Sequence, residues 1–126
     1  MDASEVEQAR AEQVLELAVA LARGIAGAAL DVRREAILPV LQQALRELPS
    51  ATQRVEVMLH PEDLPVVAGY LETGDAGPRC QLVADPAIAP GGCRIATEQC
   101  DIDATVPSRW KRLMASLGRT EEWLDA

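Results

Sequence analysis

Aromatic residues are almost absent from this sequence. It has no phenylalanine, and only Tyr70, Trp110 and Trp123 carry a phenyl or indole ring. Hydrophobic residues still make up 48% of the 126 positions, so the core must be built from Leu, Val, Ile and Ala. A chain of this length is expected to form one domain. Because alanine-rich cores suit close helix packing, we expect helices to dominate.

Positive charge is also scarce. The net charge is −8, and Lys111 is the only lysine. A nucleic-acid binder needs a concentrated basic face, whereas the one basic segment, from Arg109 to Arg119, is typical of a solvated helix face. A phosphate-binding loop needs a lysine beside its glycines, and Gly91-Gly92 lacks one. The sequence therefore predicts neither nucleic-acid binding nor ATP hydrolysis.

Potential metal ligands are few and poorly spaced. Cys80, Cys93 and Cys100 form no C-x-x-C pair, and their odd number indicates a reducing compartment. Zinc needs four ligands, usually in close pairs, and the only histidine, His60, lies twenty residues before the first cysteine. We expect no metal and no cofactor.

A cysteine paired with His60 is the best catalytic interpretation that the sequence offers, because a histidine can activate a thiol as a nucleophile. Buried structural cysteine is the alternative, and we expect no enzyme activity and no catalytic residues. Unusually fast labelling of one cysteine by iodoacetamide near neutral pH would support catalysis.

Neither a secretory signal nor a membrane span is expected. Residues 1–10 contain three acids and no apolar run. The apolar stretch from Leu15 to Leu30 contains Glu16, Arg23 and two glycines, whereas a span needs about 20 strongly apolar residues. We interpret this stretch as a buried helix of a soluble protein.

The N-terminal part predicts two helices. Apolar residues follow helical spacing over residues 4–28. Asp31 is a plausible N-cap for a second helix that reaches Leu48. Because Pro39 stands inside that segment, either the helix kinks there or a separate first turn precedes a helix that begins near Pro39.

The period changes to two from Arg54 to His60, which predicts a strand with one wet face. A third helix is expected to begin with Pro61 at its first position and to end near Leu71. Further strands are expected over residues 79–84, 93–98 and 102–106.

A last helix is predicted to begin at Thr105–Pro107 and to end at Gly118. Thr120 is placed to cap one further turn that carries Trp123 and Leu124. The elements predict an α+β fold, with an N-terminal helical pair followed by a small, mostly antiparallel or mixed sheet of about four strands packed by two further helices. Residues 1–53 are expected to form the helical segment and residues 54–126 the α/β globular part of one domain.

Three motifs resemble a known family in their order and spacing. They are Leu59-His60-Pro61-Glu62-Asp63-Leu64, the loop from Asp85-Pro86 to Gly92-Cys93, and Ile102-Asp103-Ala104-Thr105 with Arg109 after it. With the helical half around Val14-Leu15-Glu16-Leu17-Ala18, they closely resemble the C-terminal domain of the FliH family of flagellar assembly proteins, over nearly the whole chain. That family includes the stators of type III secretion injectisomes. One departure is Cys100, which stands where the family usually carries a glycine in the hairpin turn and would be strained if the turn needs a positive φ.

The resemblance implies a non-catalytic adaptor similar to the peripheral-stalk subunits of rotary ATPases. Such proteins form homodimers, bind the N-terminal region of the export ATPase, restrain its activity, and connect it to the cytoplasmic ring and the export gate. A cytoplasmic location beside the membrane-embedded export apparatus is therefore expected. The family's upstream ring-docking segment and long glycine-spaced helix are missing from this sequence, so we expect a fragment that keeps mainly the ATPase-binding end.

Two sets of residues are candidates for these contacts. Large side chains in the closing segment suit the binding of an amphipathic helix, with the sealing of the core as the alternative for the first of them: Trp110, Leu113, Met114, Leu117, Trp123 and Leu124. For self-association the candidates are Leu17, Leu21 and Ile25, with packing against the second helix as the alternative.

Other functions stay open at this stage. The equivalent injectisome stator and a stalk subunit of a rotary proton or sodium ATPase belong to the same class, and the N-terminal region of the whole protein would discriminate the rotary version. A small cysteine-dependent enzyme belongs to another class and is tested by the labelling described above.

Overall fold

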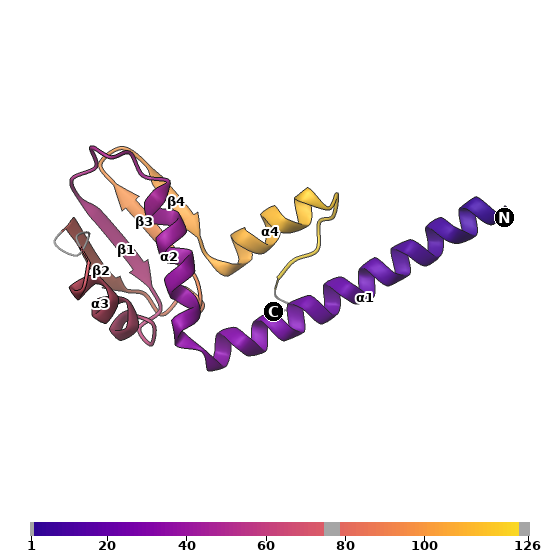
Figure 1. Ribbon diagram of the computed structural model, residues 1–126, viewed down its shortest axis with the longest axis horizontal. Coiled ribbons are helices and arrows are strands. Elements are labelled where there is room, and N and C mark those ends of the chain that lie inside the picture. The colour runs from indigo at the N-terminus through magenta and orange to yellow at the C-terminus, as the bar shows by residue number, and fades with distance from the viewer. Residues whose placement is uncertain (1, 75–78, 124–126) are drawn as a thin grey trace.

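The computed structural model describes residues 2–74 and 79–123. It consists of a long helical arm attached to a small head that contains a sheet (Figure 1). The elements follow one another as α1 (Ala3–Val32), a short 3-10 turn η1 (Arg34–Ala36), α2 (Ile37–Arg46), β1 (Val55–Leu59), α3 (Leu64–Glu72), β2 (Cys80–Ala84), β3 (Cys93–Thr97), β4 (Asp101–Ala104) and α4 (Val106–Ser116). The predicted α+β fold with a four-stranded mixed sheet is confirmed.

The sheet has the strand order β2-β1-β3-β4. Strands β1 and β2 run parallel, as expected for two strands joined by a helical crossover. The other pairs are antiparallel, and β3 and β4 form a hairpin. Cys100 lies in the hairpin turn, and no described residue other than glycine has a positive φ. The turn therefore accommodates Cys100 without the strain that a left-handed conformation would bring.

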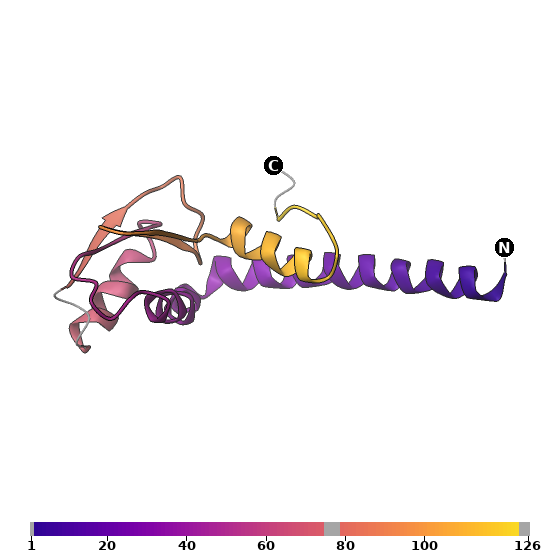
Figure 2. The ribbon, with the colours of Figure 1, turned by 90° about the horizontal axis from the view of Figure 1, so that it is seen from above.

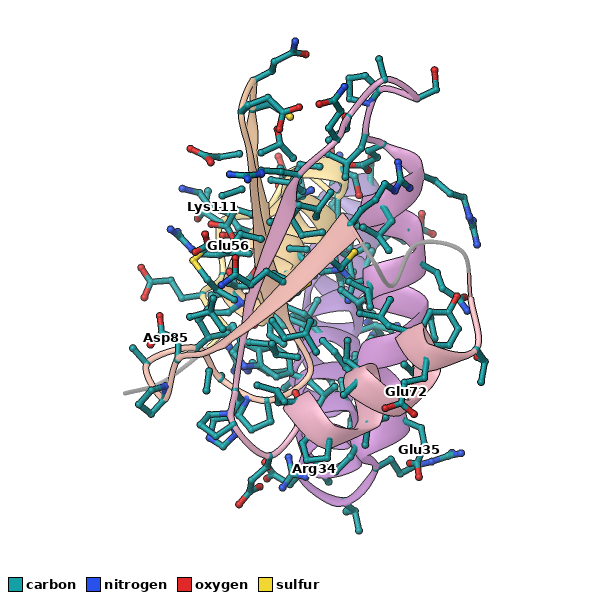
Figure 3. All side chains as sticks on the ribbon, turned by 90° about the vertical axis from the view of Figure 1, so that its left-hand side faces the viewer. Arg34, Glu35, Glu56, Glu72, Asp85 and Lys111 are labelled. Atoms are coloured by element: carbon teal, nitrogen blue, oxygen red, sulfur yellow. The ribbon has the colours of Figure 1, made fainter. Side chains whose placement is uncertain are left out.

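One face of the sheet carries the core. Val55, Val57 and Leu59 alternate with more exposed residues along β1, as the period of two predicted. Helices α2 and α3 cover this face with apolar side chains such as Ile37 and Leu41, and Figure 3 shows both helices on the same side of the sheet. Helix α2 belongs to the predicted helical segment, residues 1–53. It packs into the same core as the strands that follow residue 53.

The connection between the first two helices differs from one prediction. Asp31 is not an N-cap but lies in the last turn of α1, which ends when Arg33 adopts an extended conformation. The alternative of a separate first turn is confirmed, because η1 precedes α2. Pro39 stands in the first turn of α2, where a backbone N–H has no partner within the helix.

Two other predicted helix starts are wrong. Pro61 lies in a turn, and α3 begins at Leu64 with Pro65 in its first positions. The turn forms because the N–H of Glu62 donates to Nδ1 of His60 (3.1 Å) and the N–H of Asp63 to the carbonyl of His60 (2.9 Å). No helical turn follows Thr120 over residues 120–123, and Leu124 lies outside the described residues.

Helix α1 is not the buried helix that its composition suggested. It projects away from the head (Figures 1 and 2), and Val19 is its one buried residue. By length and composition alone it would be able to cross a membrane. The prediction that this helix is buried is wrong, because an apolar pattern shows only that a helix has an apolar face. It does not show that another part of the same chain covers that face.

Candidate functional site

A groove with mostly apolar walls lies between α1 and α4. Its volume is about 470 Å³. Helix α4 runs beside the second half of α1, and Figure 1 shows the segment after α4 turning back toward α1. The lining residues come from both helices and from that segment: Ala26, Ala29, Leu30, Val106, Arg109, Trp110, Arg112, Leu113 and Trp123.

The start of α4 is fixed by Asp103. Its carboxylate accepts hydrogen bonds from the hydroxyls of Thr105 (2.6 Å) and Ser108 (2.7 Å) and from the Thr105 N–H (3.0 Å). Burial would raise the pKa of Asp103, but these bonds and the Arg94 guanidinium outweigh it and lower the pKa to about 2. The ionised carboxylate also suits the positive end of the helix dipole, so α4 leaves the sheet in one defined direction.

The end of α4 is fixed as well. Gly118 has φ of 72°, and the N–H of Arg119 donates to the carbonyl of Met114 (2.8 Å) while that of Gly118 donates to Ala115 (3.0 Å). This pair of bonds is a Schellman motif, in which glycine avoids the steric cost of the left-handed conformation. The prediction that Gly118 stops the helix is confirmed.

A small second core joins α4 to α1. Trp110 and Met114 are buried against Val19, and Leu15 and Trp123 pack around them. The rings of Trp110 and Trp123 meet edge to face, with centroids 5.2 Å apart. Trp110 and Met114 were predicted to contact a partner. They instead pack inside the molecule, between the arm and α4.

The other predicted contact residues are more accessible. Leu113 is 53% exposed and Leu117 50% exposed, one turn apart on α4. Only Leu113 lines the groove. Trp123 is half-buried, and Leu124 falls outside the described residues. The groove therefore brings Leu113, Trp110 and Trp123 together and leaves Leu117 on the surface beside it.

The predicted self-association residues are exposed on α1. Leu17 is 62%, Leu21 56% and Ile25 69% exposed, and Val14 extends this set by one turn. We call these four residues the outer α1 stripe. Helix α2 does not cover them, so the alternative of internal packing does not apply.

Sequence reasoning missed a buried junction at the base of the arm. Asp63 is 1% exposed and accepts a hydrogen bond from the Gly91 N–H (2.9 Å). Arg34 pairs with Glu62 (2.6 Å), and its second terminal nitrogen lies 4.0 Å from Asp63. Leu30 packs directly on Gly91, where an added Cβ would lie 2.4 Å from its Cδ2. The available signal was the Asp63 carboxylate, but the predicted helix start at Pro61 placed it in a first helical turn, where an acid suits the helix dipole.

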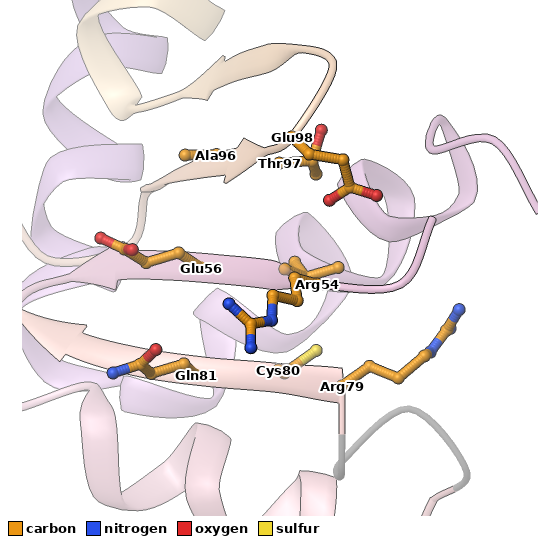
Figure 4. A pocket seen from close by; sticks show the side chains of 9 residues that line it. Arg54, Glu56, Arg79, Cys80, Gln81, Ala96, Thr97 and Glu98 are labelled. Atoms are coloured by element: carbon orange, nitrogen blue, oxygen red, sulfur yellow. The ribbon is translucent and has the colours of Figure 1, made fainter. Parts of the chain in front are cut away.

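A second hollow, of about 530 Å³, lies beside the ends of β1, β2 and β3 (Figure 4). Charges of both signs line it, including Arg54, Glu56 and Glu98. The Arg79 guanidinium donates a hydrogen bond to the carbonyl of Thr52 (3.0 Å). The described residues at this hollow provide no nucleophile paired with a base.

The cysteines also lack such a pairing within the described part of the chain. Cys93 is fully buried, and burial raises the pKa of its thiol to about 11 in spite of the Arg109 charge. Burial raises the pKa of the Cys80 thiol too. A thiol with a raised pKa is a poor nucleophile at neutral pH, and Nδ1 of His60 accepts the Glu62 N–H instead of meeting a cysteine.

The fold and the groove define a class of protein: an α+β head on a helical arm, with apolar side chains exposed on the arm and beside the groove. Comparison with known proteins gives the family. The model of the family described as flagellar assembly protein FliH matches residues 2–113, and the chain belongs to that family.

Two relatives carry the same description. The flagellar assembly protein FliH of Escherichia coli (strain K12) is 30% identical over 103 residues, covering 82% of this chain and 45% of that protein. The Salmonella typhimurium protein is 29% identical over 103 residues, covering 82% and 44%. The chain therefore spans less than half the length of these relatives.

Proposed function

We propose that this chain is a non-catalytic stator, or adaptor, of the flagellar protein export apparatus, which binds the N-terminal helix of the export ATPase and restrains its activity. The observation that carries the proposal is the apolar groove between α1 and α4, in a member of a flagellar assembly family. An amphipathic helix binds by placing apolar anchors into such a groove.

The groove has the features that a helix-binding site needs. Leu30, Val106 and Trp110 give it apolar walls, and Leu113 is exposed at its side. Arg109 and Arg112 add positive charge at one wall. Asp103 fixes the start of α4, and the packing of Leu30 on Gly91 holds the base of α1, so a ligand would meet walls that are already in place where the arm joins the head.

Substitution of Leu113 tests the site. Leu113→Asp should weaken binding of the export ATPase by at least about tenfold, because a charge would replace an apolar contact in the groove. Leu117→Asp is the matched control, since it changes the same residue type one turn further along α4. It should reduce affinity by less than about threefold. Titration of the purified proteins measures both.

Deletion of the N-terminal helix of the ATPase gives the complementary test. The shortened ATPase should no longer be retained by this chain in a pull-down. Binding that survives the deletion would contradict the docking mode, and a loss caused by Leu117→Asp but not by Leu113→Asp would move the site out of the groove.

The outer α1 stripe has a role in the same proposal: it pairs with the stripe of a second copy to form a homodimer. A second copy brings an identical apolar surface, so a two-fold arrangement buries both stripes at once. Leu21→Glu should shift the molecular mass measured by light scattering toward the monomer across a concentration series. Ala20→Glu, exposed on the same helix, should leave the mass unchanged, and equal masses for the parent and Leu21→Glu would reject the stripe as the interface.

In this proposal the protein acts in the cytoplasm beside the export apparatus and, in its full length, also contacts the cytoplasmic ring and the export gate. It does not insert into the membrane, because Glu16 and Arg23 within α1 would be costly in lipid. The flagellar descriptions of the two relatives favour this system over an injectisome.

A further inference from the structure

The contact between the arm and the head depends on a short segment after α4. Helix α1 leaves the head at Arg33, the one extended residue between it and η1. Leu30 packs on Gly91, and further along α1 the side chain of Val19 packs against α4 while Arg23 and Gly27 contact residues 119–123. The direction of the arm is therefore set by the base junction together with a second attachment further along the helix.

Residues 119–123 make that second attachment without regular secondary structure. Arg23 of α1 donates to the carbonyl of Glu122 (2.8 Å). The Trp123 ring lies against α1 at Gly27, where an added Cβ would be 3.7 Å from Cζ2, and against Trp110 of α4. Arg119 donates through Nε to both carboxylate oxygens of Glu121 (2.8 Å each), which orders the segment between α4 and the tryptophan.

The attachment is loosely packed. Trp123 lines the groove between α1 and α4. It also lines a different hollow, of about 490 Å³, between α4 and residues 119–122. Beneath it, the indole N–H of Trp110 is buried and has no acceptor among the described residues. A buried donor left without a partner destabilises the arrangement that buries it. The contact of Trp123 with Trp110 and α1 is therefore less stable than a fully packed contact would be.

We propose that residues 119–123 are a latch that holds α1 at a fixed angle to the head, and that a helix entering the groove beside Trp123 changes this angle. The first part rests on the contacts of Trp123 and Arg23, and the second part rests also on the proposed function. The latch and the docking helix meet because Trp123 lines the groove.

The length of the arm makes such a change large at its far end. Thirty helical residues span about 45 Å, so a tilt of about 10° moves the tip by about 8 Å. Docking in the groove would thereby reposition whatever the far end of α1 is attached to. A packed side chain with two alternative arrangements is a common element of such coupling.

Distance measurements between spin labels test the latch. One label is placed through Gln8→Cys near the tip of α1, and the other is placed on Cys100, which is exposed in the β3–β4 turn. Cys80→Ser removes the remaining accessible thiol, while Cys93 is buried. An excess of unlabelled chain ensures that each measured pair lies within one molecule.

The parent should give one narrow distance distribution, and Trp123→Ala should widen it by about twofold, because the arm then pivots at Arg33. Trp123→Phe keeps a ring against α1 and should stay close to the parent. Arg23→Gln removes the charge that lies near Glu121 and weakens the bond to the Glu122 carbonyl, and it should widen the distribution less. Unchanged distributions in both Trp123→Ala and Arg23→Gln would overturn the latch.

A peptide with the sequence of the N-terminal helix of the export ATPase separates the two proposals. If the peptide binds and shifts the distance distribution of the parent, the coupling holds. Binding without any shift would overturn the coupling while the docking site stands. A peptide that fails to bind would overturn the proposed function, whereas the comparison of Trp123→Ala with the parent would still decide the latch.

Discussion

Replacing Asp63 with alanine should lower the free energy of unfolding by about 3 kcal/mol, since the change leaves the buried N–H of Gly91 without an acceptor and removes a buried carboxylate beside Arg34. The Gly91 N–H loses its acceptor, and a buried terminal nitrogen of Arg34 loses the carboxylate charge that lies 4.0 Å away. Arg34 is 29% exposed, so water offsets part of its loss. Chemical denaturation followed by circular dichroism measures the change.

Glu62→Ala is the control for this prediction. Glu62 also pairs with Arg34, at 2.6 Å, but its side chain is 60% exposed. A pair of this kind contributes less than about 1 kcal/mol. Asp63→Asn should fall between the two because it keeps an acceptor for Gly91. If Asp63→Ala were no less stable than Glu62→Ala, the junction would not hold the base of the arm.

The second large effect is expected at Gly92. An alanine Cβ there would lie 2.7 Å from the backbone nitrogen of Val106, 2.8 Å from Cα of Thr105 and 3.0 Å from the carbonyl oxygen of Ala104. All three atoms belong to the backbone that links β4 to α4, so no flexible side chain is available to move aside. Overpacking of this kind costs about 1–3 kcal/mol, and we expect Gly92→Ala to lie at the upper end of that range.

Gly92→Ala should also weaken the proposed binding of the export ATPase, because relief of the clash displaces the start of α4 and α4 forms one side of the groove. Gly24→Ala is the control. It lies within α1 with no atom within 4 Å of its added Cβ, so it should stabilise the helix by up to about 1 kcal/mol. Thermal unfolding compares the two variants, and equal midpoints would show that the β4–α4 link tolerates displacement.

Local features of this fold follow from local sequence. The alternation from Val55 to Leu59 predicted β1 and the face that it buries, because successive strand side chains point to opposite sides. Gly118 predicted the end of α4, since a left-handed residue is needed there. The helix starts at Asp31 and Pro61 were wrong because each residue type permits several local roles, and contacts distant in the sequence select among them.

The candidate site was predicted only in part. The closing segment around Trp110, Leu113 and Trp123 does line the groove, but its opposite wall comes from Ala26 and Leu30 of α1. These residues are distant in the sequence and carry no signal beyond helical spacing. For the same reason, the sequence did not show that Trp110 and Met114 are buried against Val19 while Leu113 is exposed.

The sequence by itself determined the α+β class, the strands, and the motifs that place the chain in its family, since these depend on side-chain spacing along a few residues. Only the tertiary structure decided that α1 bends away at Arg33, that its outer stripe is exposed, and that Asp63, Gly91 and Leu30 meet at its base. Spacing fixes which face of an element is apolar, whereas the path of the whole chain fixes what that face contacts.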